Sequence, residues 1–262
     1  MKVFLSFFKQ GFKSNSIYKI DYLLGILGSC IQIVITVAIW RALYAGASSM
    51  DGISFRMVTT NFVLSIGLSY LFSFNDYAVQ AKLYDGTITM ELLRPIDYRI
   101  SLLANDLGNI FFKLISNFTP VFLIAIFGIG IIGPVNVKCF GLFLLSMLLG
   151  FFILLGLSFI VKMTTFWIMN VWSLSVLKGL LISVFSGITL PLWFMPERIV
   201  RIIRLTPLDS IYFTPIQMYF NQMQTNDIVF SFIKQLFWIL IFFAIGNIMW
   251  HNGRKRLVVQ GG

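Results

Sequence analysis

The sequence predicts an all-α membrane protein with a single transmembrane domain over residues 1–262. Of its 262 residues, 58% are hydrophobic and 11% are charged, whereas an ordinary soluble domain carries about 25% charged residues. The apolar residues gather in long runs without the two-residue alternation of a membrane β-barrel. Aromatic residues make up 16% of the chain, which is typical of a protein whose helices end at membrane interfaces.

The first segment, MKVFLSFFKQGFK, predicts an amphipathic helix. Its aromatic and aliphatic side chains fall on one side and its lysines on the other, namely Phe4, Leu5, Phe8 and Phe12 against Lys2, Lys9 and Lys13. Such a helix lies in the interface of the inner leaflet; the alternative is a helix packed on a neighbouring segment. It is not a signal peptide, because the apolar run stops at Lys9 and no small-residue cleavage site follows.

Six apolar stretches then predict six transmembrane helices. They lie at 22–40, 57–75, 114–133, 139–161, between 162 and 191, and at about 228–250. A helix of 19 residues is roughly 28 Å long and crosses the hydrocarbon core. The first four stretches carry no charge, while the fifth contains Lys178 and the sixth contains Lys234.

Lysine and arginine predict the orientation, because cytoplasmic segments are enriched in them. With the N-terminus inside, the inner segments hold 13 basic residues and the outer segments hold 7. The outer ones are Arg41, Arg56, Lys138, Arg198, Arg201, Arg204 and Lys234. The excess predicts a multi-pass protein of the cell membrane with both termini in the cytoplasm. It also accounts for the net charge of +10 without nucleic acid as a partner.

The inner connection at 76–113 contains the stretch GTITMELLRP, which predicts a short, well-bounded helix. Gly86 is expected to break the helix that continues from the second span, residues 87–93 form about two turns, and Pro95 ends the element. Asp97 is expected to cap the helix that leads to the third span.

One face of this short helix is expected to be apolar. Ile88 and Leu92, spaced i and i+4, form a ridge suited to a groove on a partner, and Asp85, Glu91 and Arg94 supply polar contacts around it. The alternative is an ordinary loop tucked against the bilayer.

Several kinds of chemistry are missing from the sequence. His251 is the single histidine, and neither a GxxxxGK[ST] phosphate loop nor a pair of acids within a span is present. We therefore expect no enzyme activity, metal or cofactor in this chain. The acidic residues fall in or near connections, so ion-coupled transport, which uses ionisable groups along the pathway, is disfavoured. Energy for transport is expected to come from another protein.

Two regions resemble the permeases of ABC-2 type transporters. LYDGTITMELLRPIDYRISLLANDLG, at 83–108, resembles the segment between the second and third spans of that family. The stretch at 186–220 resembles its Ser-Gly, Pro, Pro, Pro pattern after the fifth span, here Ser186, Gly187, Pro191, Pro196 and Pro207. The N-terminal helix and the six spans also fit, so the resemblance covers nearly the whole chain.

The resemblance implies an export half-transporter. Two permease subunits, identical or paralogous, pair above two separate ATP-binding subunits, which hold the ATP and magnesium. The coupling helix, which touches the ATPase, comprises Asp85, Gly86, Thr87, Ile88, Glu91, Leu92, Leu93, Arg94 and Pro95. Short re-entrant helices around Gly187, Pro191, Pro196 and Pro207 form the outer gate between the fifth and sixth spans. The family's usual Glu-Gly-Thr-Leu-Glu is replaced here by Asp-Gly-Thr-Ile-Thr at 85–89.

Three residues within the spans are further candidates. Lys178 either lines the substrate path or subunit interface, or extends its ammonium along its own stem to the inner leaflet. Gly25 and Ser29 form an i, i+4 pair of small residues, which either admits the partner permease closely or arises by chance in a glycine-containing span.

The sequence thus favours the membrane-spanning permease subunit of an ATP-driven exporter. Its cargo is expected to be amphipathic, such as a drug, a peptide antibiotic or a lipid-linked molecule. The alternative is a stand-alone channel or secondary transporter. A membrane enzyme is a third class, disfavoured by the single histidine and the lack of paired acids in a span.

Overall fold

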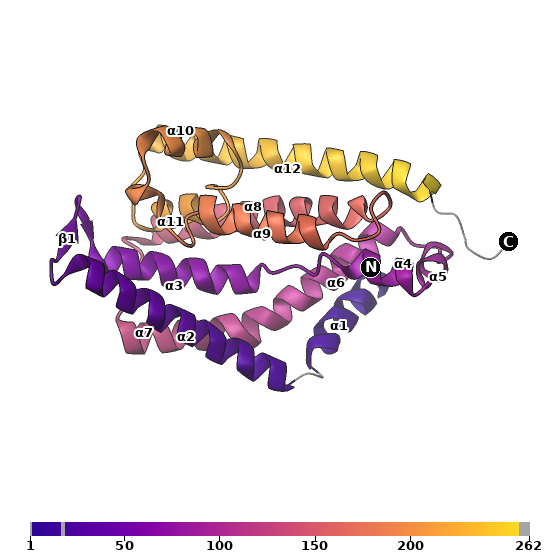
Figure 1. Ribbon diagram of the computed structural model, residues 1–262, viewed down its shortest axis with the longest axis horizontal. Helices are drawn as coiled ribbons and strands as arrows, with labels where there is room; N and C mark the ends of the chain where they lie inside the picture. The colour runs from indigo at the N-terminus through magenta and orange to yellow at the C-terminus, as the bar shows by residue number, and fades with distance from the viewer. Residues whose placement is uncertain (1, 17–18, 257–262) are drawn as a thin grey trace.

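The computed structural model describes residues 2–16 and 19–256 as a bundle of helices (Figure 1). The helices are α1 Lys2–Ser16, α2 Lys19–Tyr44, α3 Phe55–Leu71, α4 Ala78–Tyr84, α5 Ile88–Leu92, α6 Tyr98–Lys113, the π-helical η1 Leu114–Phe118, α7 Thr119–Ile129, α8 Val137–Thr164, α9 Trp172–Phe185, the 3₁₀ turn η2 Leu192–Phe194, α10 Glu197–Leu205, α11 Phe213–Tyr219, α12 Thr225–Gly253 and the 3₁₀ turn η3 Arg254–Arg256. Strands β1 Ser49–Met50 and β2 Ile53–Ser54 pair antiparallel between α2 and α3.

Four helical stretches in the described part of the chain are long and apolar enough to cross a membrane. They are Leu23–Tyr44, Tyr98–Ile129, Val137–Thr164 and Thr225–Arg256. Helix α3 has 17 residues and α9 has 14, so both are shorter than the other four. All of these helices nevertheless run along the long axis of the bundle (Figure 1).

The third predicted span belongs to a longer helix than its apolar run indicated. Helices α6, η1 and α7 follow one another without a break from Tyr98 to Ile129, whereas the prediction began at residue 114. The π-helical turn precedes Pro120, which has no N–H to donate into the helix. Within that turn the N–H of Thr119 donates to the carbonyl oxygen of Leu114, and the wider turn accommodates the proline.

Helix α1 packs closely along α6. A Cβ on Gly108 would lie 2.1 Å from the carbonyl oxygen of Phe8, so the approach depends on glycine. Phe8 and Phe12 also pack on Phe111, with ring centroids 5.9 and 6.3 Å apart. Much of the apolar face that was predicted to enter the membrane interface is therefore used against α6, as the alternative prediction described.

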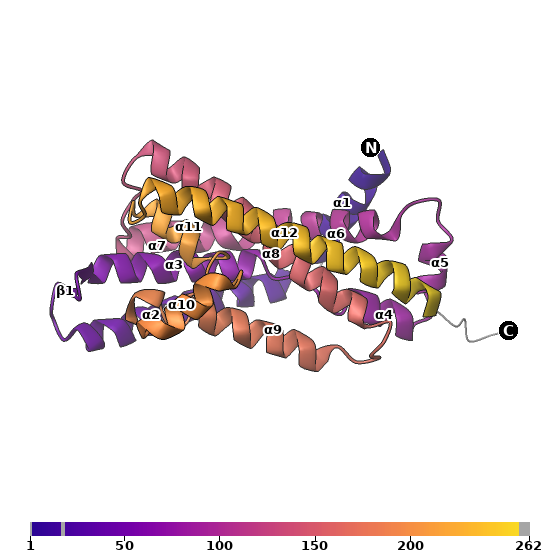
Figure 2. The same ribbon diagram turned by 90° about the horizontal axis from the view of Figure 1, so that it is seen from above.

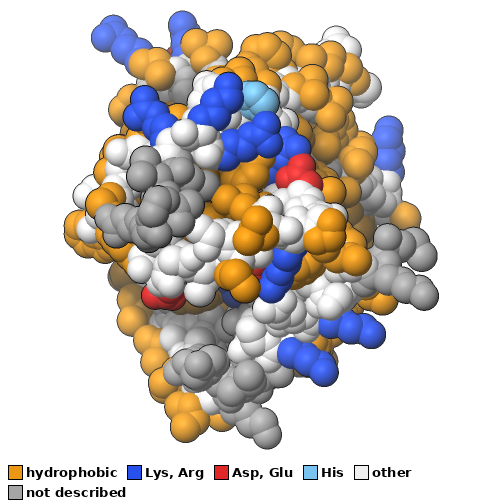
Figure 3. All heavy atoms as spheres, turned by 90° about the vertical axis from the view of Figure 1, so that its right-hand side faces the viewer, with side chains coloured by type: hydrophobic (Ala, Val, Ile, Leu, Met, Phe, Trp, Pro, Cys, Tyr) orange, Lys and Arg blue, Asp and Glu red, His pale blue; other side chains and the backbone are white. Residues whose placement is uncertain are grey.

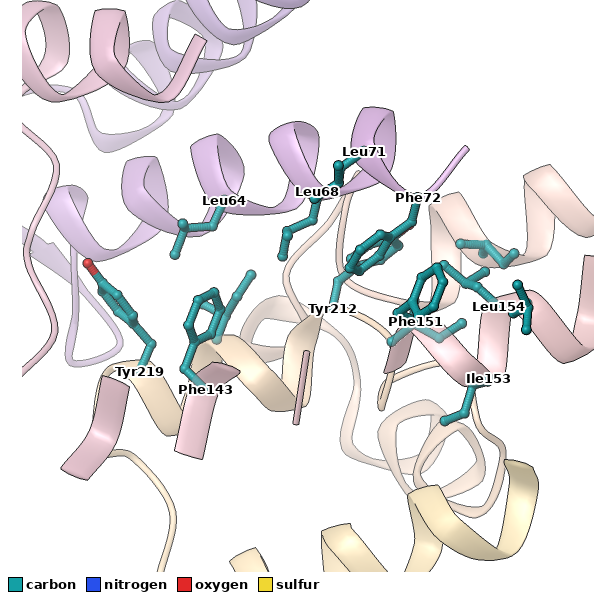
Figure 4. Packing of buried hydrophobic residues seen from close by; sticks show 14 of the residues in the cluster. Leu64, Leu68, Leu71, Phe72, Phe143, Phe151, Ile153, Leu154, Tyr212 and Tyr219 are labelled. Atoms are coloured by element: carbon teal, nitrogen blue, oxygen red, sulfur yellow. The ribbon is translucent and has the colours of Figure 1, made fainter. Parts of the chain in front are cut away.

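The largest part of the core lies between α3, α8 and α11. Figure 4 shows side chains of α3 facing those of α8 and of the α11 segment: Leu64, Leu68 and Phe72 against Phe143, Phe151, Tyr212 and Tyr219. Every residue of α11 is buried. Gln235 of α12 is also buried, and its amide donates to Ser146 of α8 and to the carbonyl oxygen of Ser210 at 2.8–3.0 Å. These contacts fix α11 and α12 against α8.

The two ends of the bundle are formed by different elements. Helices α1, α4 and α5 and the C-terminal end of α12 lie toward one end, while the β1–β2 hairpin and α10 lie at the other (Figures 1 and 2). Figure 3 views the first of these ends, where Lys and Arg side chains stand out and few acidic side chains are visible. We call this the basic end.

Candidate functional site

The stretch GTITMELLRP forms a compact turn and helix at the basic end. Gly86 has φ +67°, a left-handed conformation that glycine adopts without strain. It separates α4 from α5, and the Thr89 hydroxyl donates to the Gly86 carbonyl at 2.9 Å. The expectation that Gly86 breaks the helix continuing from the second span is wrong, because α3 already ends at Leu71 and residues 72–77 precede α4.

The outward face of α5 differs from the predicted ridge. Ile88 is 3% exposed and packs with Val79, Tyr98, Met163 and Trp250 of its own chain, and Leu92 is partly buried beside the same cluster. Ile88 is therefore turned away from any partner. Met90 and Leu93, by contrast, are 67% and 81% exposed, and they form the apolar surface that α5 presents.

Glu91 holds α5 in place from within the chain. Its two carboxylate oxygens lie 3.0 Å from Lys82 of α4 and 3.0 Å from Arg94. The Arg94 guanidinium also lies 5.8 Å from the ring centre of Phe7 on α1. The polar groups expected to surround a docking ridge are thus largely used to fix α5 against α4 and α1. Thr87 and Asp85, at the start of the element, and Pro95 after it are exposed.

Asp97 caps α6, as predicted. Its carboxylate accepts from the Arg99 N–H at 2.9 Å and also pairs with the Arg99 guanidinium. The guanidinium holds the pKa of the Asp97 carboxyl below its ordinary value. Arg99 reaches further to the side-chain oxygen of Asn247 on α12, at 2.7 Å, so the start of α6 is joined to α12.

A buried carboxylate lies between α3 and α4. Asp76 is 3% exposed and accepts hydrogen bonds from Ser158 of α8 at 2.5 Å and from Ser175 of α9 at 2.7 Å. The Lys178 ammonium of α9 lies 2.5 Å from Oδ2. A charge is tolerated in such a place when it is paired and its oxygens are hydrogen-bonded. Asp76 therefore connects α8 and α9 to the segment that leads into α4.

Neither expectation for Lys178 included a carboxylate partner. Its side chain is 16% exposed, and its ammonium pairs with Asp76.

Lys162 and Asp106 form a second buried ion pair, which joins α8 to α6. The Lys162 ammonium lies 2.6 Å from Oδ2 of Asp106, and Lys162 is 1% exposed. The sequence had placed Lys162 in an inner segment and Asp106 in a connection. The structure corrects the placement of Asp106, because α6 begins early enough to carry it into the bundle, and it places Lys162 in the last turn of α8.

Helix α4 is also fastened to the loop between α8 and α9. The Tyr84 hydroxyl donates to the Met169 carbonyl at 2.9 Å, and the Val171 N–H donates to the Gln80 side chain at 3.0 Å. Together with the contacts of Asp76, these bonds connect the α4–α5 element to α8, to α9 and to the loop between them.

The small pair on α2 faces its own chain. Ser29 is buried and donates to the Gly25 carbonyl at 2.8 Å. A Cβ on Gly25 would lie 3.2 Å from the amide nitrogen of Asn117 in η1. The small residues thus admit η1 of the same chain.

The predicted outer-gate residues lie between α9 and α12. Gly187 has φ +87° and lies against Phe213, which a Cβ would approach to 3.0 Å. Pro191 and Pro196 directly precede η2 and α10, and Pro207 is buried in the turn before α11. Three short helices therefore occupy this segment, and α11 is enclosed within the bundle.

Sequence reasoning missed the acids and serines that bind the buried lysines. Ser175 and Lys178 are three residues apart and share a helix face, and Asp76 directly follows the predicted second span. These patterns indicate polar helix faces, but the residues that pack on those faces are distant in sequence. A local sequence pattern therefore cannot show which residues form the pairs.

Comparison with protein families matches residues 30–261 to the ABC-2 family transporter proteins. No individual curated protein matches the chain at a significant level. The family match covers most of the chain and includes α5, the Asp76–Lys178 and Asp106–Lys162 ion pairs, and the segment between α9 and α12. The chain therefore belongs to the ABC-2 family of transporter proteins and is a multi-pass membrane permease.

Proposed function

We propose that this chain is the permease subunit of an ATP-driven exporter, and that α5 is its contact with a separate ATP-binding subunit. The observation that supports this most directly is the exposure of Met90 and Leu93 on a helix whose opposite face is fixed by Ile88. An exposed apolar pair on a rigid element suits a protein partner. The chain itself has no phosphate loop to bind ATP.

A series of polar contacts from α5 to α8 and α9 supplies a path for movement. When the partner displaces α5, the bonds of Glu91 carry the displacement to α4. Asp76 and Tyr84 then pass it to α8 and α9. Breaking a buried ion pair costs about 3–5 kcal/mol, so these helices are expected to move together with α4.

The proposed topology places the basic end in the cytoplasm of the cell membrane, with both termini on that side. Six membrane passes then include α3 and α9, whose shorter lengths are compensated by packing within the bundle and by a second permease subunit, identical or paralogous. The segment from Gly187 to α11 acts as the outer gate. The cargo is amphipathic: a drug, a peptide antibiotic or a lipid-linked molecule.

The alternative is a stand-alone channel or secondary transporter, and the buried acids bear on it. Asp76 and Asp106 are buried acids of the kind that ion-coupled transporters use. Each is already paired with a lysine, so neither carboxylate is left to bind a transported ion. Gradient-driven flux through the purified chain alone would favour this alternative.

The coupling role is tested by replacing Met90 and Leu93 with serine. Apolar contacts contribute on the order of 1.5–3 kcal/mol per fully buried side chain, so binding of the ATP-binding subunit should weaken by about tenfold or more. Co-purification and cargo-stimulated ATP hydrolysis are the measurements. Val137→Ser is the matched control, because Val137 is 88% exposed at the start of α8, outside both α5 and the proposed gate. Parental binding and hydrolysis in the double variant would exclude α5 as the coupling element.

A further inference from the structure

A mostly apolar cavity of about 410 Å³ lies at the basic end, between α1, α6, α8 and α12. Its size falls in the range of about 300–1,000 Å³ that is typical of small-molecule sites. The side chains that line it are Phe4, Asp97, Arg99, Ile100, Leu102, Leu103, Asp106, Leu155, Phe159, Phe243 and Asn247. Three of the four helices around it belong to stretches long enough to cross a membrane, so lipid is the surrounding solvent.

The polar and apolar parts of the lining are arranged along the helices. Asp97 and Arg99 stand at the start of α6, and Asn247 is joined to Arg99 at 2.7 Å. From Asp97 to Leu103 the helix advances about 9 Å into the bundle. Phe243 on α12 lies one turn deeper than Asn247 in the same direction. The cavity is therefore charged at its mouth and mostly apolar further in, with Asp106 at its deep end.

The charged groups at the two ends of the cavity differ in whether they can contact a ligand. Asp106, at the deep end, is neutralised by Lys162 at 2.6 Å. At the mouth, the Arg99 side chain is 39% exposed beside Asp97, and Arg254 also acts on Asp97 electrostatically. The mouth thus has one more basic than acidic group, and Arg99 has surface left to contact an anion.

We propose that this cavity binds a membrane phospholipid, with one acyl chain inside and the phosphate at Arg99. Basic pockets between transmembrane helices on the cytoplasmic side are known to suit lipid headgroups, and arginine matches the geometry of phosphate. The exposed Ile100 marks the opening toward the bilayer. The proposal rests on the membrane position of the helices and requires neither ATP nor cargo.

Lipid binding is measured by native mass spectrometry on the full-length chain after delipidation in detergent. Phosphatidylethanolamine, phosphatidylglycerol and diacylglycerol are added back separately. We expect both phospholipids to bind about tenfold or more tightly than diacylglycerol, since a charge-assisted contact is lost with the phosphate. Preference for phosphatidylethanolamine would identify Asp97 as the acceptor of its ammonium, and preference for phosphatidylglycerol would identify Arg254 as a second phosphate contact. Equal binding of diacylglycerol would overturn the proposal.

Two variants locate the site. Arg99→Gln should weaken phospholipid binding by about tenfold, and Leu103→Trp should reduce it by filling the cavity. Arg201→Gln is the matched control for the first, because Arg201 is also paired with a carboxylate, Glu197, on α10. Leu240→Trp, at an exposed site on α12, is the control for the second. Parental lipid binding in both Arg99→Gln and Leu103→Trp, with size-exclusion profiles unchanged, would overturn the site. Because no partner subunit is present, failure here would leave the proposed export function untouched.

Discussion

The ammonium of Lys178 lies 2.5 Å from Oδ2 of Asp76, although the two residues are 102 positions apart. The pair joins α9 to the segment that precedes α4, and so links α9 to the proposed coupling element. Ser158 and Ser175 complete the environment of the carboxylate. The pair is therefore both a structural joint of the bundle and a step in the proposed path of movement.

Removing either partner of this pair should be costly. Lys178→Met leaves Asp76 buried and unpaired, and we expect the free energy of unfolding to fall by about 3 kcal/mol. Asp76→Asn should cost a similar amount, because it leaves the ammonium unpaired. The double variant should lose less than the sum by about 1–3 kcal/mol. Thermal unfolding in detergent measures this cycle. Additive losses would show that the two residues do not interact.

Gly187 should resist substitution because of its backbone. At φ +87°, alanine is expected to cost about 1–2 kcal/mol, with a further cost from the contact with Phe213. Gly179→Ala in α9 is the control, since open space surrounds Gly179 and alanine favours a helix by about 0.5–1 kcal/mol over glycine. The melting temperature should fall in the first variant and hold or rise in the second. The opposite order would contradict the left-handed turn before the proposed gate.

The proposed orientation predicts which surfaces reach the outside of the cell. A cysteine at Asp85 should be protected from an impermeant thiol reagent in intact cells, and a cysteine at Arg201 should react. The native Cys30 and Cys139 are replaced with serine first, and the serine background is the control. Both test positions are exposed in the bundle, so protection reports the membrane rather than burial. Labelling of Asp85→Cys from outside the cell would contradict the proposed orientation and favour the opposite one.

Asp97 predicts a defined response to acid. Its pKa is lowered from an ordinary value of 3.8, chiefly by Arg99, so folding stabilises the ionised form. That stabilisation is present above about pH 3.8 and is lost as the pH falls toward the folded pKa. Asp97→Asn keeps a capping side chain but removes the charge. It should lower the melting temperature at pH 5 and pH 8 alike.

Below pH 3.8 the difference between the parent and Asp97→Asn should shrink. Asp85→Asn, at an exposed carboxylate, is the control and should change little at any pH. A difference between the parent and Asp97→Asn that grows on acidification would contradict the lowered pKa.

Long apolar runs predicted their helices well. The stretches at 22–40, 139–161 and 228–250 lie inside α2, α8 and α12, because a helix that meets lipid must be predominantly apolar over its length. The third stretch was placed too late. Its helix begins at Tyr98, and the charge of Asp106 inside it is neutralised by Lys162 from another helix. A charge count along the chain does not contain that information.

The sequence predicted where the turn and the cap of the candidate site lie, but not which face of α5 is exposed. Gly86 and Asp97 adopt the turn and the cap that their residue types favour, because both are local effects. Which face of α5 points outward depends on the cluster around Trp250, whose residues come from α4, α6, α8 and α12. The predicted Ile88 ridge failed for that reason: an i, i+4 pair indicates an apolar face but not what covers it.

The exposure of Met90 and Leu93 has a consequence for how the transporter is made in the cell. Under the proposed topology these side chains face the cytosol rather than lipid. A permease synthesised in excess of its ATP-binding partner therefore exposes apolar surface to water. A partner that binds only the folded permease stabilises it by mass action, and uncovered apolar surface favours aggregation. The supply of ATP-binding subunit would thereby set the abundance of the permease, and the two subunits would accumulate in fixed proportion.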